Sequence, residues 1–456
     1  MKKLILLVTS FILLMAISQP KFSKAAEIVN YPNEVNVSVQ LASTLTMTLN
    51  GDYQLLNKDT SAVTDIPKGT ILTVKKGTSG VNVTYTNFNQ NSVAGFDVQE
   101  KVSTSTSLTK LSNGKTYRGS FWLRANGSQV QVSNVLDMED YLKGVVPSEM
   151  PASWPKEALK AQAIAARSYA ANSMKLSDTA ASQVYGGYSA EDSRTNTAIN
   201  ETEGLTVKYG TKTIQTFFFS TSGGRTANVS DVWNSSQSNF PYLVSVEDPY
   251  ENVVCPNNTA CSYPYSKSSF VNWTETFTAD QLLTSFGITD KTAKITDLVL
   301  GTIGQNGEVK SVTLKTTAGD KTISGNELNV RKAFPIQNDA VYNSLYSNWF
   351  TAKLNGSTGV VSVQTSSGTQ QVSDLKGQAV QTASGQIVLS DSNVSIQTSS
   401  GVISNTATGI TSVTLTGKGW GHRVGMSQYG ARGFALMGYT AEQILTHYFK
   451  GTTVSK

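Results

Sequence analysis

The stretch WPKEALKAQAIAARSYAA, residues 154–171, constrains the fold most strongly. Alanine is the best helix former and proline suits the first turn of a helix, so the sequence predicts a helix from near Pro155 to about Asn172. At 3.6 residues per turn Lys156, Lys160 and Arg167 share one face, as expected of a solvated face. Small residues cover much of the remaining surface, so neighbouring backbone can approach this helix closely.

The rest of the chain is dominated by the patterns of short strands. Residues 27–112 alternate apolar with polar residues and are broken by turn signals, and residues 203–331 also read as strands, with a helix near 279–286. Thr440 and Gln443 form a capping-box pattern for a final helix that stops at Gly451. We therefore predict an α+β fold: a mixed, β-rich core with the alanine-rich helix and a C-terminal helix, plus a β-rich N-terminal region and a small β insertion.

Near-identical pentapeptides, QTSSG, QTASG and QTSSG, start at residues 364, 381 and 397. Such repeats within strand patterns indicate a β-hairpin or small β module inserted into another domain. The segment has few charged residues, which argues against catalysis there. The expected organisation is a signal peptide (1–25), a β-rich N-terminal region (26–112), the first part of a catalytic core (113–353), the β-repeat insertion (354–410) and the C-terminal part of the core (411–456).

The N-terminus has the features of an export signal. Lys2 and Lys3 precede an apolar run from Leu4 to Ile17, which is too short to span a bilayer comfortably, and small residues allow cleavage after Ala25. The alternative is an uncleaved anchor that tethers the protein to a membrane. Removing residues 1–25 takes away four lysines, so 37 basic and 32 acidic residues become 33 and 32. This balance argues against nucleic acid, or an electrostatic membrane surface, as a partner.

The chain has two cysteines, Cys255 and Cys261, in the segment CPNNTAC. In an oxidising compartment the expectation is a small-loop disulfide between them. A zinc site needs about four ligands, and the two histidines, His422 and His447, lie far downstream. Motifs for nucleotide binding are also missing from the sequence, so we expect neither a metal nor another cofactor.

Glu149 is the first candidate for chemistry, because it lies between Pro147 and Pro151 on restrained backbone with apolar neighbours. Burial among such neighbours would raise the pKa of the carboxyl toward neutrality, which suits a general acid. The alternative is a structural acid that interacts with a helix dipole or with Arg167. The residues alone leave both interpretations open.

Two glycine-rich segments supply further candidates. In FFFSTSGGRT, residues 217–226, a hydrophobic strand ends in hydroxyl groups and backbone N–H groups on a turn, and in GWGHRVG the single His422 lies among glycines that allow close approach of a ligand. The alternatives are an ordinary hairpin turn in the first segment and, in the second, a histidine that bonds its own loop.

Together these stretches resemble the stage II sporulation protein D family, which includes the amidase enhancers of bacterial cell walls. The resemblance rests on YLKGVVPSEMPASWPKEALKAQAIAARSYA, FFFSTSGGRTANVSDVW and GWGHRVGMSQYGARGFALMGYTAEQILTHYF, and covers roughly residues 116–349 and 411–450. It implies a secreted peptidoglycan lytic transglycosylase, located in the cell wall or at the outer face of a bacterial membrane, that cleaves glycan strands without stem peptides.

The resemblance also assigns residues. Glu149, in Pro-Ser-Glu-Met, matches the catalytic glutamate of the family. The expected substrate-binding residues are Lys160, Gln162, Arg167, Ser220, Ser222, His422, Ser427 and Gln428. Arg423 stands where the family usually has glycine, so we expect a different loop geometry and a cationic side chain in the groove. Asparagines lie between the cysteines, so the metal site of some relatives is not carried over.

Three functions remain in competition. In a lytic transglycosylase Glu149 alone is acid and base, and the product carries a 1,6-anhydro ring. A hydrolase needs a second carboxyl group, for which the nearest candidates in sequence are Glu139, Asp140, Glu191 and Asp192. The third function is a non-catalytic wall-binding protein that activates an N-acetylmuramoyl-L-alanine amidase, which would then be a partner besides the glycan strands.

Overall fold

The computed structural model describes residues 28–102, 107–173, 175–252, 270–336, 343–356 and 410–456, together with 361–365, 368–372, 377–382, 385–390, 394–398 and 401–405. It confirms the predicted α+β class, with several sheets and a smaller helical part. The candidate signal segment and the cysteine pair lie outside the described residues. Within the described ranges, none of the helices is long and apolar enough to cross a membrane.

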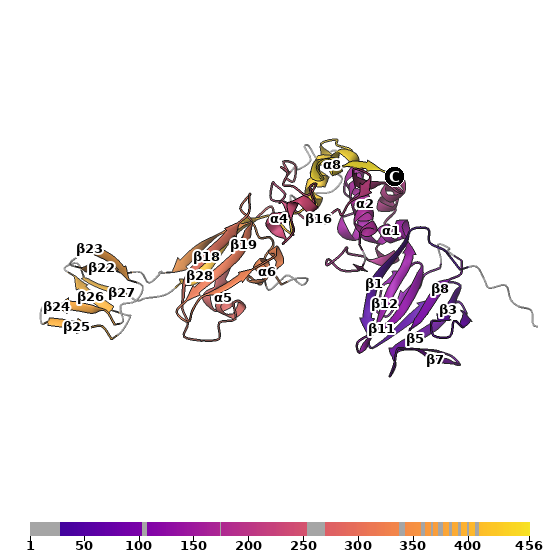
Figure 1. The fold of residues 1–456 in the computed structure, drawn as a ribbon, viewed down its shortest axis with the longest axis horizontal. Coiled ribbons are helices and arrows are strands. Elements are labelled where there is room, and N and C mark those ends of the chain that lie inside the picture. The colour runs from indigo at the N-terminus through magenta and orange to yellow at the C-terminus, as the bar shows by residue number, and fades with distance from the viewer. Residues whose placement is uncertain are drawn as a thin grey trace, which may run out of the picture.

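Two sheets, antiparallel except for the parallel pairing of β13 with β1, occupy one end of the molecule (Figure 1). One has the order β13-β1-β12-β11-β8-β3-β4 and the other β10-β9-β2-β5-β6-β7. The strands are β1 (Glu34–Ala42), β2 (Thr44–Leu49), β3 (Tyr53–Asn57), β4 (Val63–Ile66), β5 (Ile71–Lys76), β6 (Val81–Tyr85), β7 (Phe88–Ser92), β8 (Phe96–Glu100), β9 (Thr109–Leu111), β10 (Thr116–Tyr117), β11 (Ser120–Asn126), β12 (Gln129–Asp137) and β13 (Leu176–Ser177).

Along several of these strands, buried apolar side chains alternate with more exposed ones. In β2 the side chains of Leu45, Met47 and Leu49 are buried and those between them are more exposed, as the two-residue period of a strand requires. β1 pairs along its length with β12, from Glu34 opposite Asp137 to Ala42 opposite Val130. Strands from both sides of residue 112 therefore share a sheet, and the expected domain boundary at that residue divides a hydrogen-bonded unit.

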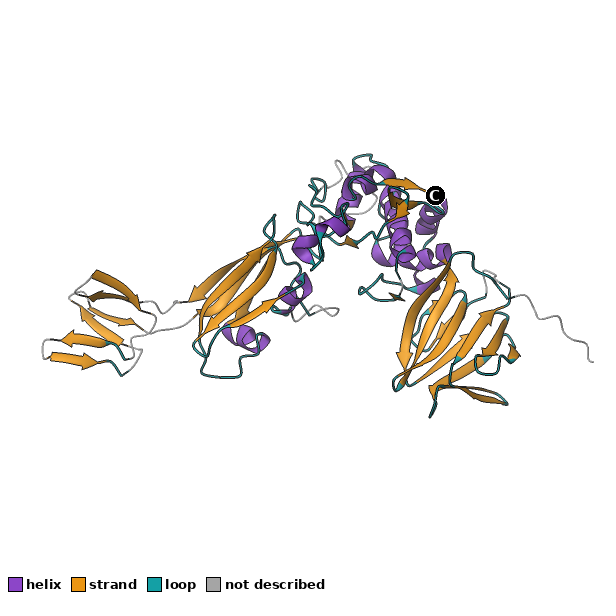
Figure 2. Ribbon diagram, in the orientation of Figure 1, coloured by secondary structure: helices purple, strands orange, loops and turns teal. Residues whose placement is uncertain are grey.

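Most of the helices gather between the N-terminal sheets and a second β region (Figure 2). They are α1 (Met138–Glu149), α2 (Lys156–Ala171), α3 (Ser193–Glu201), α4 (Val229–Val232), α7 (Gln428–Leu436) and α8 (Ala441–Tyr448), with two 3₁₀ turns at Gly187–Ala190 and Gln237–Asn239. Short strands join them: β14 (Thr206–Tyr209), β15 (Lys212–Thr213) and β30 (Thr453–Ser455) form one sheet, and β16 (Phe218–Phe219) pairs in parallel with β29 (Met426–Ser427).

Helix α2 confirms the predicted helix and explains its composition. Ala163 and Ala166 pack into the core of the N-terminal sheets, whereas Ala158, Ala161 and Ala165 pack into a second core formed with α7 and α8. Small side chains on both sides let one helix lie between two cores. The prediction of a solvated basic face is wrong at Arg167, which is buried.

The second β region is a six-stranded sheet with β17-β28-β18-β19-β20 in order and β21 also paired with β28. Its elements are β17 (Asn272–Thr278), α5 (Ala279–Ser285), β18 (Ile295–Ile303), β19 (Val309–Thr316), β20 (Lys321–Ser324), α6 (Glu327–Lys332), β21 (Phe350–Gly356) and β28 (Ile410–Lys418). Helix α5 begins with a capping box at Thr278 and confirms the helix expected near residue 279. A capping box at Thr440 likewise begins α8, which ends at Tyr448, before the predicted stop at Gly451.

Each pentapeptide repeat spans the turn of one hairpin. The threonine and glycine of each repeat are cross-strand partners: Thr365 with Gly368, Thr382 with Gly385 and Thr398 with Gly401. The hairpins consist of β22 (Val361–Thr365) with β23 (Gly368–Val372), β24 (Ala379–Thr382) with β25 (Gly385–Val388), and β26 (Val394–Thr398) with β27 (Gly401–Asn405). They lie at the far end of the molecule from the N-terminal sheets (Figure 1).

Candidate active site

Glu149 is the last residue of α1. Pro151 disfavours helical backbone at the residue before it, and Met150 accordingly has extended backbone, with φ −128° and ψ 136°. The helix therefore ends at Glu149. The proline that the sequence places after the carboxylate is what puts this side chain at a helix terminus.

The Glu149 carboxyl group is held by two donors from distant segments. The backbone N–H of Val184 donates to Oε1 at 2.7 Å, and the Gln428 side-chain amide donates to Oε2 at 3.0 Å. The residue is half-buried. Burial raises the pKa of this carboxyl, and the two hydrogen bonds oppose that rise only in part. Within the described part of the chain, Glu149 forms no ion pair, so the geometry suits a proton donor.

The Val184 donor is fixed by a buried network beneath it. The Tyr141 hydroxyl donates to the Gln183 side-chain carbonyl at 3.0 Å, and the Gln183 amide donates to the Ala166 carbonyl at 3.3 Å. These contacts tie the segment that carries Val184 to α1 and α2. Sequence reasoning missed Val184 because its contribution is a backbone N–H group, which leaves no side-chain signal.

Gln428, the second donor, is the first residue of α7. Ser427 caps this helix by accepting a hydrogen bond from the Gly430 N–H at 3.0 Å. Since β29 pairs in parallel with β16, Ser427 lies opposite Phe219. The structure thus brings the C-terminal segment onto the strand that leads into the glycine-rich turn, and places Gln428 against Glu149. The expected contact of Gln428 with substrate stays a prediction.

Arg167 and Lys160 pair with other acids. The Arg167 guanidinium binds Glu139 through two hydrogen bonds, of 2.8 and 2.7 Å, and also donates to the Leu205 carbonyl. Lys160 pairs with Glu157 and Glu201 on the surface of α2 and α3. The alternative in which Arg167 holds Glu149 is therefore wrong, while a role for either residue in substrate binding stays a prediction.

Gln162 is completely buried on α2, and its amide nitrogen and oxygen have no hydrogen-bond partner among the described residues. Most buried amides are hydrogen-bonded, so this group is an exception in the neighbourhood of α7. Its expected contact with substrate stays a prediction.

One serine of the glycine-rich turn and one serine of the C-terminal segment contact Glu251, a residue that sequence reasoning did not select. Ser222 and Ser427, both buried, each donate to the Glu251 carboxylate, the first through its backbone N–H and the second through its hydroxyl at 2.7 Å. The Ser220 carbonyl accepts from the Tyr429 N–H at 3.0 Å. Substrate binding by these three serines stays a prediction, and their present contacts join the turn to α7.

His422 bonds its own loop, which is the second of the two interpretations that the sequence left open. Its Nδ1 accepts from the Val424 N–H at 3.2 Å, and its ring packs edge-on or tilted against Phe217, Phe219 and Trp233. Burial and the nearby charge of Arg331 lower the pKa of the imidazole to about 3, so the ring is neutral. Its contact with substrate stays a prediction.

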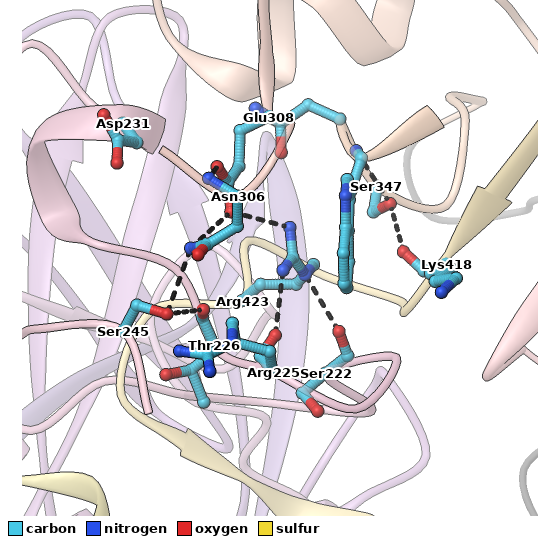
Figure 3. A network of polar contacts seen from close by, with 12 residues as sticks. Ser222, Arg225, Thr226, Asp231, Ser245, Asn306, Glu308, Ser347, Lys418 and Arg423 are labelled. Carbon is cyan, nitrogen blue, oxygen red and sulfur yellow. Dashed lines mark hydrogen bonds and ion pairs between the residues drawn. The ribbon is translucent and has the colours of Figure 1, made fainter. Parts of the chain in front are cut away.

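The expectation that Arg423 points into the groove is wrong. Its backbone has φ +63°, in the left-handed region that glycine adopts without cost, and its side chain is completely buried. The guanidinium donates to the carbonyls of Ser222 at 2.9 Å and Arg225 at 2.8 Å, and pairs with Glu308 at 3.3 Å (Figure 3). It also lies over the Trp349 ring, 4.1 Å from the centroid. The Arg423 side chain thus connects the glycine-rich turn at residues 217–226 to the β18–β19 hairpin and has a structural role.

The acids considered for a second catalytic carboxyl all have cationic partners. The pairs are Glu139 with Arg167, Asp140 with Lys143, Glu191 with Arg118 and Asp192 with Arg194. Each pair engages at least one oxygen atom of the carboxyl group. No group of three or more metal-binding side chains gathers in the described ranges.

The family comparison matches this region of the chain. Residues 126–209 match the family described as stage II sporulation protein, SpoIID. The matched segment begins in the β11–β12 hairpin and contains α1, α2 and α3, so it includes Glu149 and Val184. Residues 126–209 thus form a SpoIID-family domain, and this domain contains Glu149, which forms no ion pair among the described residues.

Individual relatives extend the similarity beyond that domain. The amidase enhancer of Bacillus subtilis (strain 168) is 32% identical over 69% of this chain, which spans 40% of that relative's length. Stage II sporulation protein D of the same organism is 26% identical over 81% of this chain and 89% of its own length. The stage II sporulation protein D of Bacillus amyloliquefaciens is 28% identical over 72% of this chain and 77% of its own.

Proposed function

We propose that the protein is a lytic transglycosylase that cleaves the MurNAc–GlcNAc bond in peptidoglycan glycan strands without stem peptides. The observation that carries the proposal is the environment of Glu149: a half-buried carboxyl group with a raised pKa, two hydrogen-bond donors and no cationic partner in the described part of the chain. A raised pKa favours the protonated form of a carboxyl group, and in that form the group can donate a proton to a leaving oxygen.

In the proposed reaction Glu149 gives its proton to the bridging oxygen, and the bond between this oxygen and C1 of MurNAc breaks. The resulting oxocarbenium-like sugar is attacked at C1 by its own C6 hydroxyl oxygen. The Glu149 carboxylate takes the hydroxyl proton, which restores the acid and leaves a 1,6-anhydro ring. The Val184 N–H and the Gln428 amide supply hydrogen bonds to the carboxylate while it is charged.

The paired state of the neighbouring acids favours this reaction over hydrolysis. A hydrolase needs a second carboxyl group to act as a base or a nucleophile, whereas Glu139, Asp140, Glu191 and Asp192 all form ion pairs. The single-glutamate mechanism needs no second acid, because the sugar provides its own nucleophile.

A second candidate function is supported by one comparison. The relative with 32% identity is named an amidase enhancer, so the protein would bind glycan strands and stimulate a separate cell-wall amidase without cleaving the strands. In both cases the site of action is the bacterial cell wall or the outer face of the membrane, and the partners are glycan strands.

The test is digestion of purified, peptide-free glycan strands by the wild type and by Glu149→Gln, with products identified by mass spectrometry and peptide-bearing strands as the control substrate. We expect anhydro-muramyl ends from the wild type alone, and only on peptide-free strands. Reducing ends would replace the proposal with a hydrolase. Strand binding without products, together with faster release of peptides by an added amidase, would support the enhancer instead.

A further inference from the structure

A second carboxylate, that of Glu251, lies at the centre of the contacts behind the candidate active site. It is 1% exposed and accepts hydrogen bonds from three successive backbone N–H groups, those of Ser222, Gly223 and Gly224, the last two at 2.9 and 3.2 Å. The Ser427 hydroxyl donates to it at 2.7 Å. Consecutive N–H groups that converge in this way form an anion-binding concavity, and here a side chain of the same protein fills it.

Glycine is required for this arrangement of amides. Gly223 and Gly224 have φ +76° and +103°, which other residues adopt only with strain. A Cβ atom at Gly223 would also lie 2.6 Å from the Cβ of Lys418 and 2.8 Å from the Gly419 nitrogen. The backbone conformation of the turn is therefore restricted, and in that conformation its N–H groups point at Glu251.

The contacts of Glu251 lead in two steps to Glu149. Ser427, which donates to Glu251, caps α7, and the next residue, Gln428, donates to Glu149. On the other side of Gln428, the Tyr429 N–H donates to the Ser220 carbonyl at 3.0 Å. Gln428 is thus held from both sides by contacts to one turn, and Glu251 closes that turn onto the helix.

We propose that Glu251 is a positioning residue, which locks the glycine-rich turn to the start of α7 and thereby keeps the Gln428 amide on Glu149. The catalytic consequence rests on the proposed function of Glu149, whereas the structural coupling does not.

Among the described residues, Asp248, Tyr448 and Arg423 are titratable groups that interact electrostatically with Glu251. Burial and the charge of Glu251 raise the pKa of Asp248 to about 8, so at neutral pH Asp248 holds a proton. The Tyr448 hydroxyl is neutral because burial raises its pKa, and Arg423 is the cation on this side.

The first variant to test is Glu251→Gln. Its amide would place an NH₂ group among N–H donors, so the turn should open and Gln428 should leave Glu149. Glu149 then loses a hydrogen bond that lowers its pKa, and the high-pH limb of kcat/KM should move to higher pH. Misplacement of this kind should lower kcat about 10- to 100-fold. Glu251→Asp keeps the charge and should recover part of the rate.

A matched control is Glu327→Gln, which removes another buried carboxylate, one paired with Arg331 in α6. It should lower the melting temperature without moving the high-pH limb. In addition, Gln428→Met should produce the same limb shift as Glu251→Gln, and the double variant should shift no further. An unmoved limb in Glu251→Gln, or shifts that add in the double variant, would overturn the proposal.

A measurement that does not depend on catalysis separates this proposal from the proposed function. If the wild type cleaves no glycan, the proposed catalytic role of Glu149 is wrong. Amide hydrogen exchange then still tests whether Glu251 holds the turn to the start of α7. Glu251→Gln should accelerate exchange at Gly430 and at residues 222–224 at least tenfold relative to Glu327→Gln. Unchanged protection at Gly430 would show that Glu251 does not hold the start of α7.

Discussion

Glu149 and Glu308 are acids removed from water in different ways. Glu308 is completely buried and pairs with Arg423, which is also completely buried (Figure 3). Glu149 is half-buried, and uncharged donors, a backbone N–H and a side-chain amide, contact its two oxygens. A cation compensates the loss of hydration in the first case, and the charge of the second is compensated only in part. The first group is therefore structural, while the second is suited to hold a proton.

Three other acids are paired as Glu308 is. Buried Glu327 pairs with Arg331, and the half-buried Glu139 and Glu191 each pair with an arginine. An acid that lacks such a partner and keeps a path to solvent is a candidate for function, because functional sites are where pKa values are most perturbed. Variants that add a cation beside Glu149, or remove the cation beside Glu308, test whether the partner determines the role of each acid.

The largest effect is expected from Gln428→Lys, which places a cation on Glu149 and makes it resemble Glu308. The cation should lower the pKa of Glu149 and remove the general acid at neutral pH, with a loss of about 10²- to 10⁴-fold in cleavage rate. The rate profile should retain activity at acidic pH, unlike that of Glu149→Gln. A neutral-pH rate equal to that of the wild type would show that protonation of Glu149 is not required.

The converse change is Arg423→Ala, which leaves Glu308 buried without its cation. Removing one partner of a buried pair costs about 3–5 kcal/mol in free energy of unfolding. Glu308→Gln added to Arg423→Ala should restore part of that loss. Arg423→Gly should be about 1 kcal/mol less damaging than Arg423→Ala, because it also relieves the left-handed backbone at φ +63°. Denaturant unfolding measures all three, and equal stability of Arg423→Ala and wild type would contradict the account.

The pH dependence of stability tests the effect of burying a carboxyl group, that of Asp248, whose pKa is raised by burial and by the charge of Glu251. Its pKa in the folded protein is about 8, above the ordinary value of about 3.9. The folded state binds this proton more tightly, so the stabilising contribution is complete below about pH 4 and is lost as the pH rises through about 8. Unfolding at a series of pH values should show the wild type losing stability relative to Asp248→Asn across this window. Parallel pH curves would contradict the assigned protonation.

The smallest effect is expected from removing the hairpins. Gly356 and Ile410 are cross-strand partners, so residues 357–409 can be replaced by a two-residue turn between β21 and β28. Stability should change by less than about 0.5 kcal/mol, as for changes away from a core, and the cleavage rate on short glycan strands should be unchanged. A large loss of rate on these strands would mean that Glu149 depends on the hairpins.

Local signals in the sequence were sufficient for several elements. Proline and alanine predict α2 to within a residue at each end, and Thr278 and Thr440 are in place at their capping boxes. These features depend on neighbours within one or two turns. Local signals also selected Glu149, through its flanking prolines, although its position as the last residue of α1 was not predicted.

Features that depend on distant partners were not predictable. Arg423 among glycines resembles an exposed cation, and its buried partner, Glu308, is 115 residues away. Glu251 lies in no recognisable motif. Its role depends on hydrogen bonds from the N–H groups of a turn 27 to 29 residues earlier in the chain. Arg167 was placed beside Glu149, although the carboxylate that it binds is Glu139.

The central claim is that the Glu149 carboxyl is the acid whose loss of a proton ends activity at high pH. Carbon-13 NMR of the side-chain carboxyl, assigned by comparison with Glu149→Gln, measures its pKa directly beside the pH profile of glycan cleavage. The account predicts a pKa above the ordinary range of glutamate that coincides with the high-pH limb of kcat/KM. A Glu149 that titrates at or below the ordinary range, with cleavage continuing well above it, would contradict the assignment.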